Sequence, residues 1–130
     1  MKRNVFSIFR YRGKDRYIDK ANKNLLGLVD DHHIIPKSLK KHKLIRSINY
    51  DINSNFNLFI MPNKKGKNIL NLNPDIRIHR SHYCYNLFVK DSICEIYRNN
   101  KSLDEREYNM WLFVTYLRDN LKYYTEKIPW

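Results

Sequence analysis

The chain has 130 residues, of which 42% are hydrophobic and 14% aromatic. This composition excludes a disordered chain and suits one domain with its own core. Lys and Arg total 25 against 13 Asp and Glu, a net charge of +12, so a polyanion such as nucleic acid is the expected partner. No apolar run approaches the roughly 20 residues of a membrane span, and residues 1–7 lack a signal peptide's apolar region. We therefore expect a soluble, unprocessed protein without a membrane partner; its compartment stays open, an intracellular one being expected first.

Residues 1–27 place basic side chains between aromatic and aliphatic ones. We predict a strand over residues 6–11, although its apolar side chains do not alternate cleanly, and a break at Gly13. A short helix over residues 19–26 should close at Gly27. Such an arm could follow a phosphate backbone and stack on bases, or simply pack on the core with a charged edge in solvent.

Two adjacent histidines, His32 and His33, lie in a stretch over residues 28–35 that we predict as a strand ended by Pro36. Consecutive strand residues point to opposite faces, so one ring can hold a metal while the other faces water. Phosphodiester hydrolysis uses both, because a cation neutralises the phosphate and a neutral imidazole deprotonates the attacking water. A surface histidine pair without chemistry is the alternative interpretation.

A basic segment follows over residues 37–46, predicted as a loop or a short helix. Its position beside the histidines would allow its side chains to grip phosphates. His42 lies between lysines, and we expect it to be exposed and outside the site.

An apolar stretch over residues 56–62 is predicted as a second strand, again ended by a proline. Asn57 near its start carries both donors and acceptors, so its amide can bridge backbone groups of a facing loop and fix the loop's shape. A plain turn amide is the alternative, since Asn53 and Asn55 lie beside it.

Residues 63–73 are polar and read as a surface loop, and a long helix is predicted over residues 76–97. His79 and His82 lie at its start with an i, i+3 spacing that shares one helix face. Both rings can then converge on one ion, although such a pair also arises by chance. Four of the five histidines thus fall into two tight pairs.

A capping box at residues 102–105, Ser-Leu-Asp-Glu, predicts a final helix over residues 103–123. Its apolar face is typical of a packing layer behind the site. Cys84 and Cys94 have no C-x-x-C spacing, so we expect buried free thiols and neither a disulfide nor a zinc knuckle.

The order of these motifs resembles that of the HNH, or ββα-metal, nucleases. The closer likeness is to the double-histidine subset, the AHH-type and colicin-like DNases of bacterial toxins and of mobile or viral elements. Residues 32–36, His-His-Ile-Ile-Pro, resemble the family's H-H-I-V-P. Residues 57–62 resemble its N-x-x-x-L-P, and residues 82–86 resemble its H-P-x-Y-N.

The resemblance implies an α+β fold for residues 1–130 as a single HNH-like nuclease domain. A ββα-metal (His-Me finger) core would cover about residues 28–97, with the helix over about residues 103–123 packed against it. The zinc-binding cysteine pairs that flank some HNH domains are absent from the sequence. Packing of C-terminal helices must therefore hold the core.

The same resemblance implies a metal-dependent DNA endonuclease in which His33 is the general base. His32 and His82 would bind one divalent metal, with His79 as a third ligand, and Asn57 would hold the loop that orients His33. Mg²⁺ is the first choice of metal, with Mn²⁺, Ni²⁺ or Zn²⁺ as alternatives. Asp31 is expected to orient a ligand rather than bind the metal. The DNA backbone would be gripped by Lys37, Lys40, Lys41, Lys43, Arg77 and Arg80.

The sequence is also compatible with two other functions. One is a non-catalytic nucleic-acid-binding module whose histidines hold a structural zinc, and the other is an RNase of the same fold. The sequence does not fix the oligomeric state, the target sequence or the biological role, and an inhibitory partner is expected if the protein is a toxin.

Overall fold

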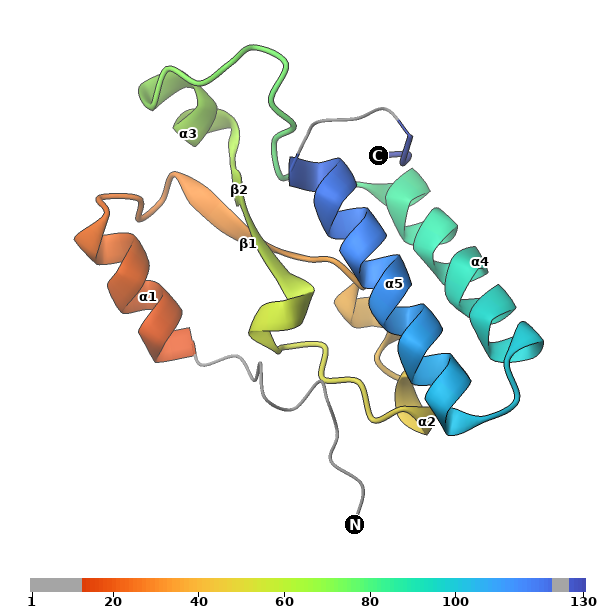
Figure 1. Ribbon diagram of the computed structural model, residues 1–130. Coiled ribbons are helices and arrows are strands. Elements are labelled where there is room, and N and C mark those ends of the chain that lie inside the picture. The colour runs from red at the N-terminus through yellow and green to blue at the C-terminus, as the bar shows by residue number, and fades with distance from the viewer. Residues whose placement is uncertain (1–12, 123–126) are drawn as a thin grey trace.

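The computed structural model describes residues 13–122 and 127–130 (Figure 1). Predicted elements that fall on residues 1–12, such as the strand over residues 6–11, lie outside the described part. Within it, no helix is both long enough and apolar enough to cross a membrane. The elements in chain order are α1 Gly13–Asn22, β1 Val29–His33, η2 Lys37–Leu39, α2 Lys43–Ser47, η3 Asn55–Asn57, β2 Leu58–Pro62, α3 Lys64–Ile69, α4 Tyr83–Asn99 and α5 Leu103–Lys122.

The two strands form an antiparallel ladder with Val29 opposite Pro62 and His33 opposite Leu58. Both predicted strands are therefore confirmed, each with a proline at or just beyond its end. Pairing continues one residue further, because the backbone N–H of Ile34 donates to the carbonyl of Asn57 at 2.8 Å. Helices together with this small sheet confirm the α+β class.

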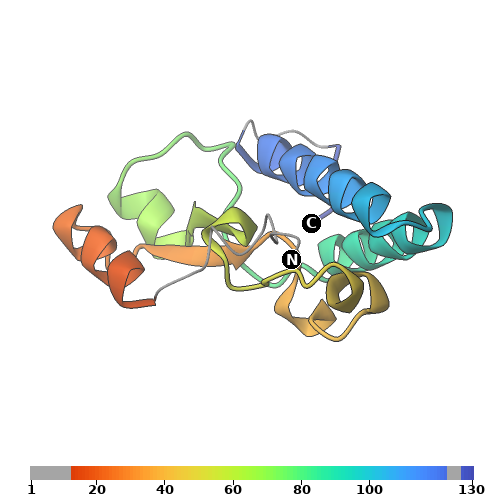
Figure 2. The same cartoon turned by 60° about the horizontal axis from the view of Figure 1, so that its bottom comes forward.

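The hydrophobic core lies between the chain that leaves β1 and the helices α2, α4 and α5. Figures 1 and 2 show α4 and α5 side by side, with the hairpin between them and α1. The capping box works as expected, since Ser102 Oγ accepts the backbone N–H of Glu105 at 3.2 Å and α5 begins at Leu103. The fully buried side chains of this core include Ile34, Ile35, Leu44, Tyr85, Val89, Ile93, Met110, Val114, Leu117 and Leu121.

Three expectations about local structure are wrong. The long helix begins at Tyr83 and not near residue 76, so the segment before it is irregular. The helix expected over residues 19–26 lies earlier in the chain, since α1 spans Gly13–Asn22. The expected loop over residues 63–73 contains α3, because Asn63 Oδ1 accepts the N–H of Gly66 at 2.8 Å and caps the helix.

Gly66 shows why α3 lies against the hairpin. It is buried, and a Cβ built at this position would lie 1.8 Å from the carbonyl oxygen of Leu28, on the approach to β1. Only glycine allows this close contact between helix and backbone. The residue that suggested a loop in the sequence is therefore a packing glycine.

Candidate metal centre

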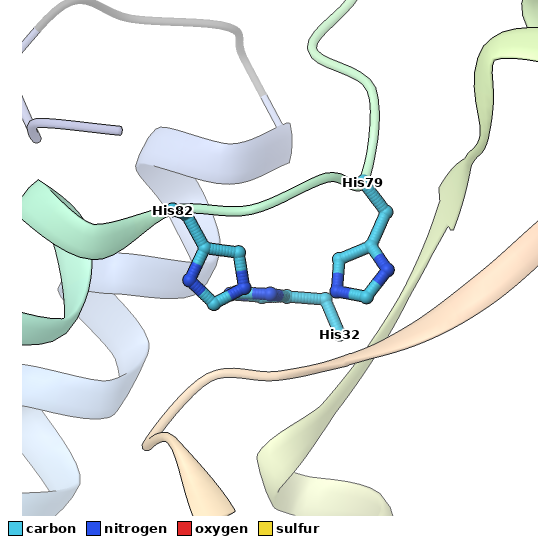
Figure 3. Close-up of side chains that lie close together, drawn as sticks. All are labelled: His32, His79 and His82. Atoms are coloured by element: carbon cyan, nitrogen blue, oxygen red, sulfur yellow. The ribbon is translucent and has the colours of Figure 1, made fainter.

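Three histidines from two segments of the chain converge beside the hairpin (Figure 3). His32 comes from β1, His79 from the irregular segment before α4, and His82 from the residue that precedes the first turn of α4. One ligand nitrogen from each ring lies within 4.8 Å of the others. The three could therefore hold one metal ion, as expected for these residues.

The backbone that delivers His79 and His82 is not a helix, contrary to the expected i, i+3 pair on one helix face. The N–H of His79 donates to the carbonyl of Pro62 at 2.8 Å, which fixes the segment to the end of β2. His82 has φ −140° and ψ 62°, outside the helical range, and the carbonyl of His82 accepts the N–H of Asn86 at 3.1 Å. The rings meet because two anchors position an irregular segment.

Hydrogen bonds at Nδ1 of His79 and of His82 leave Nε2 of each ring available to bind a metal. His79 Nδ1 lies 3.2 Å from Asp30 Oδ2, and His82 Nδ1 lies 2.9 Å from Asn86 Oδ1. Because carboxylate and amide oxygens are acceptors, each Nδ1 carries the ring proton and each Nε2 keeps a lone pair. In Figure 3 one nitrogen of each ring faces His32. This arrangement is typical of metal-binding histidines.

His32 gives the strongest indication that this cluster binds a ligand. It is fully buried, yet neither ring nitrogen has a hydrogen-bond partner among the described residues. Burial, followed by the neighbouring rings of His82 and His79, lowers the pKa of His32 to about 2. Burial also lowers the pKa of His82. A neutral imidazole with two unsatisfied buried nitrogens is costly, and a metal ion in the cluster would satisfy one of them.

The donor set fits a metal. Three neutral imidazoles form one of the ligand sets of catalytic zinc sites, which keep a fourth position open for water or substrate. Imidazole also suits nickel and copper, whereas Mg²⁺ prefers oxygen ligands.

His33 faces away from this cluster, as strand alternation predicts. It is half-buried, and its Nε2 lies 3.1 Å from Asn53 Oδ1. Since the amide oxygen is an acceptor, Nε2 carries the proton and Nδ1 is the basic nitrogen. The two adjacent histidines therefore occupy different environments.

Asn57 is fully buried and ties the chain beyond β1 to the turn before β2. Its Oδ1 accepts from the N–H of Ile35 at 2.8 Å and from the hydroxyl of Tyr50 at 2.6 Å. Its Nδ2 donates to the carbonyls of Ile35 at 3.1 Å and Ile52 at 2.8 Å. The amide lies in η3, just before the strand, and bridges backbone groups as anticipated.

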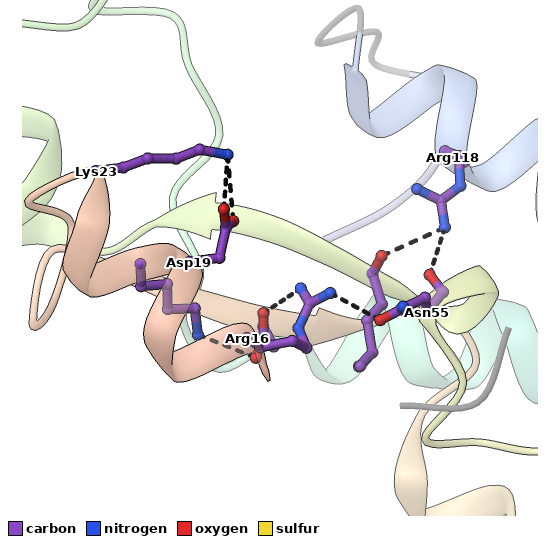
Figure 4. A network of polar contacts seen from close by, with 8 residues as sticks. Arg16, Asp19, Lys23, Asn55 and Arg118 are labelled. Atoms are coloured by element: carbon purple, nitrogen blue, oxygen red, sulfur yellow. Dashed lines mark hydrogen bonds and ion pairs between the residues drawn. The ribbon is translucent and has the colours of Figure 1, made fainter. Parts of the chain in front are cut away.

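Asp31 does not contact the cluster in the way we expected of an orienting carboxylate. It forms ion pairs with Arg16 and Lys20 of α1 (the Lys20 pair at 3.0 Å) and so fastens this helix to β1. Arg16 also donates to Asn55 Oδ1 at 3.2 Å, as Figure 4 shows. The carboxylate beside the histidines is that of Asp30, which shares a strand face with His32.

The expected phosphate-binding residues form two groups. The four lysines are exposed on η2, on the turn after it and at the start of α2, and the two arginines lie in the segment that carries His79. These residues are Lys37, Lys40, Lys41, Lys43, Arg77 and Arg80. The lysines follow the His33 end of β1, whereas the arginines lie in the segment that His79 ties to Pro62, at the end of β2.

His42, expected to be simply exposed, has a structural role. Its Nδ1 accepts the N–H of Leu44 at 3.1 Å and caps α2, and its Nε2 lies 3.2 Å from Cys94 Sγ. Cys94 is half-buried and Cys84 is exposed, so the expectation that both thiols are buried is wrong. Both cysteines are free, as expected.

Comparison with known families agrees with the geometry. Residues 27–110 match a nuclease family of the HNH/ENDO VII superfamily with conserved AHH. The chain belongs to this family, which indicates that it is a nuclease and acts on nucleic acid. Neither curated proteins nor solved structures give a match. His32-His33 is the only His-His pair in the sequence, so Asp31 stands where the family has alanine.

Proposed function

We propose that this protein is a metal-dependent endonuclease that hydrolyses phosphodiester bonds in DNA. The observation that carries the proposal is the buried His32, whose ring nitrogens lack partners and which lies among His79 and His82. Membership of the nuclease family supports the reaction class. The order β1, β2, α4, with a histidine on the first strand and another at the start of the helix, supports a ββα-metal core.

In this mechanism His32, His79 and His82 hold one divalent ion. The bound ion would neutralise charge on the scissile phosphate and on the departing 3′ oxygen, which leaves 5′-phosphate ends. The three-imidazole donor set favours Zn²⁺ or Ni²⁺ over Mg²⁺, which was the first choice from the sequence.

His33 is the proposed general base. Asn53 accepts the proton of Nε2, so the lone pair of Nδ1 is available to take a proton from the attacking water. The opposite orientation of His32 keeps the base out of the ligand set. A positioned base contributes roughly 10² to 10⁴ in rate, so His33→Ala should lose about that factor and remain folded.

Asn57 positions this base indirectly. Its amide fixes the backbone two residues beyond His33 and the turn that contains Asn53. Tyr85 adds a second anchor, because its hydroxyl donates to the carbonyl of Ile34. The base therefore lies between two fixed backbone segments, as a preorganised site requires.

We assign binding of the nucleic acid to the lysines that follow β1 and to the two arginines of the segment that carries His79. Phosphate contacts of this kind hold the backbone with little reading of sequence. We expect the affinity to fall steeply with salt, because each neutralised phosphate releases condensed counterions. The assigned residues are Lys37, Lys40, Lys41, Lys43, Arg77 and Arg80.

The test is cleavage by metal-stripped protein with Mg²⁺, Mn²⁺, Ni²⁺, Zn²⁺ or EDTA. The substrates are supercoiled plasmid and an RNA of unrelated sequence. His42→Ala is the matched control, since it removes a histidine and a helix cap outside the cluster. The proposal predicts plasmid nicking that requires metal, disappears in His33→Ala and persists in His42→Ala. Cleavage in EDTA, equal cleavage by His33→Ala, or cleavage of RNA alone would overturn it.

A further inference from the structure

Trp130 lies against the candidate metal centre although it is far from the histidines in sequence. Its ring centroid is 4.9 Å from that of His82, 5.2 Å from His32 and 5.3 Å from Tyr85. Ile128, two residues earlier, is 2% exposed and belongs to the hydrophobic core. The indole is thus held in place by a buried anchor on its own segment.

Arg77 contacts the same indole. Its guanidinium carbon lies 4.9 Å from the centroid of Trp130, a cation–π contact. Arg77 belongs to the irregular segment that also carries His79. The indole therefore touches two of the three ligand rings and one of the proposed phosphate-binding side chains.

A cavity of about 680 Å³ opens beside these contacts. Trp130 lines it together with three cations, Lys67, Arg77 and Arg80, and one carboxylate, Asp75. The excess of positive charge suits an anionic group. The indole Nε1 is buried without a hydrogen-bond partner among the described residues, so the ring still has a donor to offer a ligand.

We propose that Trp130 is a positioning residue that completes the metal centre and prepares a phosphate subsite in the adjoining cavity. Its ring fixes the orientation of His32 and His82, and its face holds the Arg77 guanidinium on the cavity wall. The ligand of this subsite is a phosphate of the nucleic-acid strand, the one adjacent to the scissile phosphate. This inference rests on the proposed function, but Trp130 lies outside the residues that match the family.

Tryptophan fluorescence tests the position of the indole without using activity. The chain has two tryptophans, and Trp111 is 45% exposed on α5. In a Trp111→Phe variant the signal comes from Trp130 alone, and titration with Ni²⁺, a quencher at short range, should remove most of it. In Trp130→Phe the signal of Trp111 should change little. Quenching of Trp111 and not of Trp130 would overturn the inference.

Binding and kinetics test the positioning role. Trp130→Ala should weaken Ni²⁺ binding in calorimetry about 10- to 100-fold, as loss of groups that support metal ligands does, and should raise KM for DNA. Trp130→Phe keeps an aromatic ring and should restore most of the metal affinity. Trp111→Ala is the control and should match the wild type in both measurements.

Trp130→Leu is a second variant, to be measured if Trp130→Ala does not fold. Leucine keeps apolar volume without a π face for Arg77, so KM should rise in Trp130→Leu relative to Trp130→Phe. If the wild type neither binds metal nor cleaves DNA, the proposed function fails. If the wild type does both, and Trp130→Ala or Trp130→Leu behaves like it, this inference alone fails.

Discussion

Replacement of Asn57 by alanine should destabilise the protein more than any exposed asparagine. The buried amide makes four hydrogen bonds, two with the backbone of Ile35, one with the carbonyl of Ile52 and one with the hydroxyl of Tyr50. Alanine leaves all four partner groups without their bond. Each buried unsatisfied group costs about 1–3 kcal/mol, but neighbouring costs do not add fully.

We therefore expect the free energy of unfolding to fall by about 3–5 kcal/mol, a large part of the roughly 5–15 kcal/mol that domains possess. The melting temperature should fall by roughly 10–20 °C. Urea unfolding followed by circular dichroism measures the change. Asn68→Ala is the control, because Asn68 is exposed on α3 and such surface changes stay within about 0.5 kcal/mol. A loss below about 1 kcal/mol in Asn57→Ala would refute the reasoning.

Two further substitutions test how α3 and α1 are attached to the hairpin. Gly66→Ala should cost more than about 3 kcal/mol in urea unfolding, since its Cβ would lie 1.8 Å from the carbonyl oxygen of Leu28. Asp31→Ala should cost about 1–3 kcal/mol at neutral pH, because it removes charged hydrogen bonds to Arg16 and Lys20. Partial burial raises the pKa of Asp31, but these two cations outweigh it and the net pKa is lowered. The stabilisation is therefore present above the unfolded-state pKa of about 3.8 and is lost as the pH falls through the lower folded-state value.

Each of these substitutions has a matched control. Gly27→Ala meets no atom within 4 Å but has φ +77°, so it should cost only about 1–2 kcal/mol. Asp19→Ala removes an exposed pair with Lys23 at 3.2 Å and should change stability by less than about 1 kcal/mol. Gly66→Ala no worse than Gly27→Ala would contradict the packing argument. A difference in unfolding free energy between wild type and Asp31→Ala that does not shrink as the pH is lowered below the unfolded-state pKa of about 3.8 would contradict the ion-pair argument.

Local sequence signals predicted the parts of the fold that depend on neighbouring residues. A following proline helped to predict both strands, an apolar run marked the second, and the capping box gave the start of α5. Alternation along a strand predicted that His32 and His33 face different environments. This prediction needs no knowledge of the tertiary contacts, because consecutive side chains of any strand point to opposite faces. The donors and acceptors of Asn57 predicted a bridge between backbone segments, which the structure contains.

Features that depend on tertiary contacts escaped prediction. The prediction that the rings of His79 and His82 lie close together is right, but the reason given for it is wrong. They do not share a helix face; a hydrogen bond from the N–H of His79 to the carbonyl of Pro62 brings them together. Asp31 pairs with Arg16 and Lys20 of α1 in place of the expected contact with a metal ligand. That pairing depends on where α1 packs, so neighbouring residues gave no signal of it. Trp130 gave no local signal at all, because its contacts with His32 span most of the chain.

The central claim is that adjacent histidines divide metal binding and catalysis between them. The most direct test measures Ni²⁺ affinity by calorimetry and plasmid cleavage in parallel for His33→Ala and His82→Ala. We expect His33→Ala to bind Ni²⁺ within about twofold of wild type while its cleavage falls roughly 10²- to 10⁴-fold. His82→Ala should lose both metal binding and cleavage. A His33→Ala protein that loses Ni²⁺ as His82→Ala does, or that cleaves like the wild type, would contradict this claim.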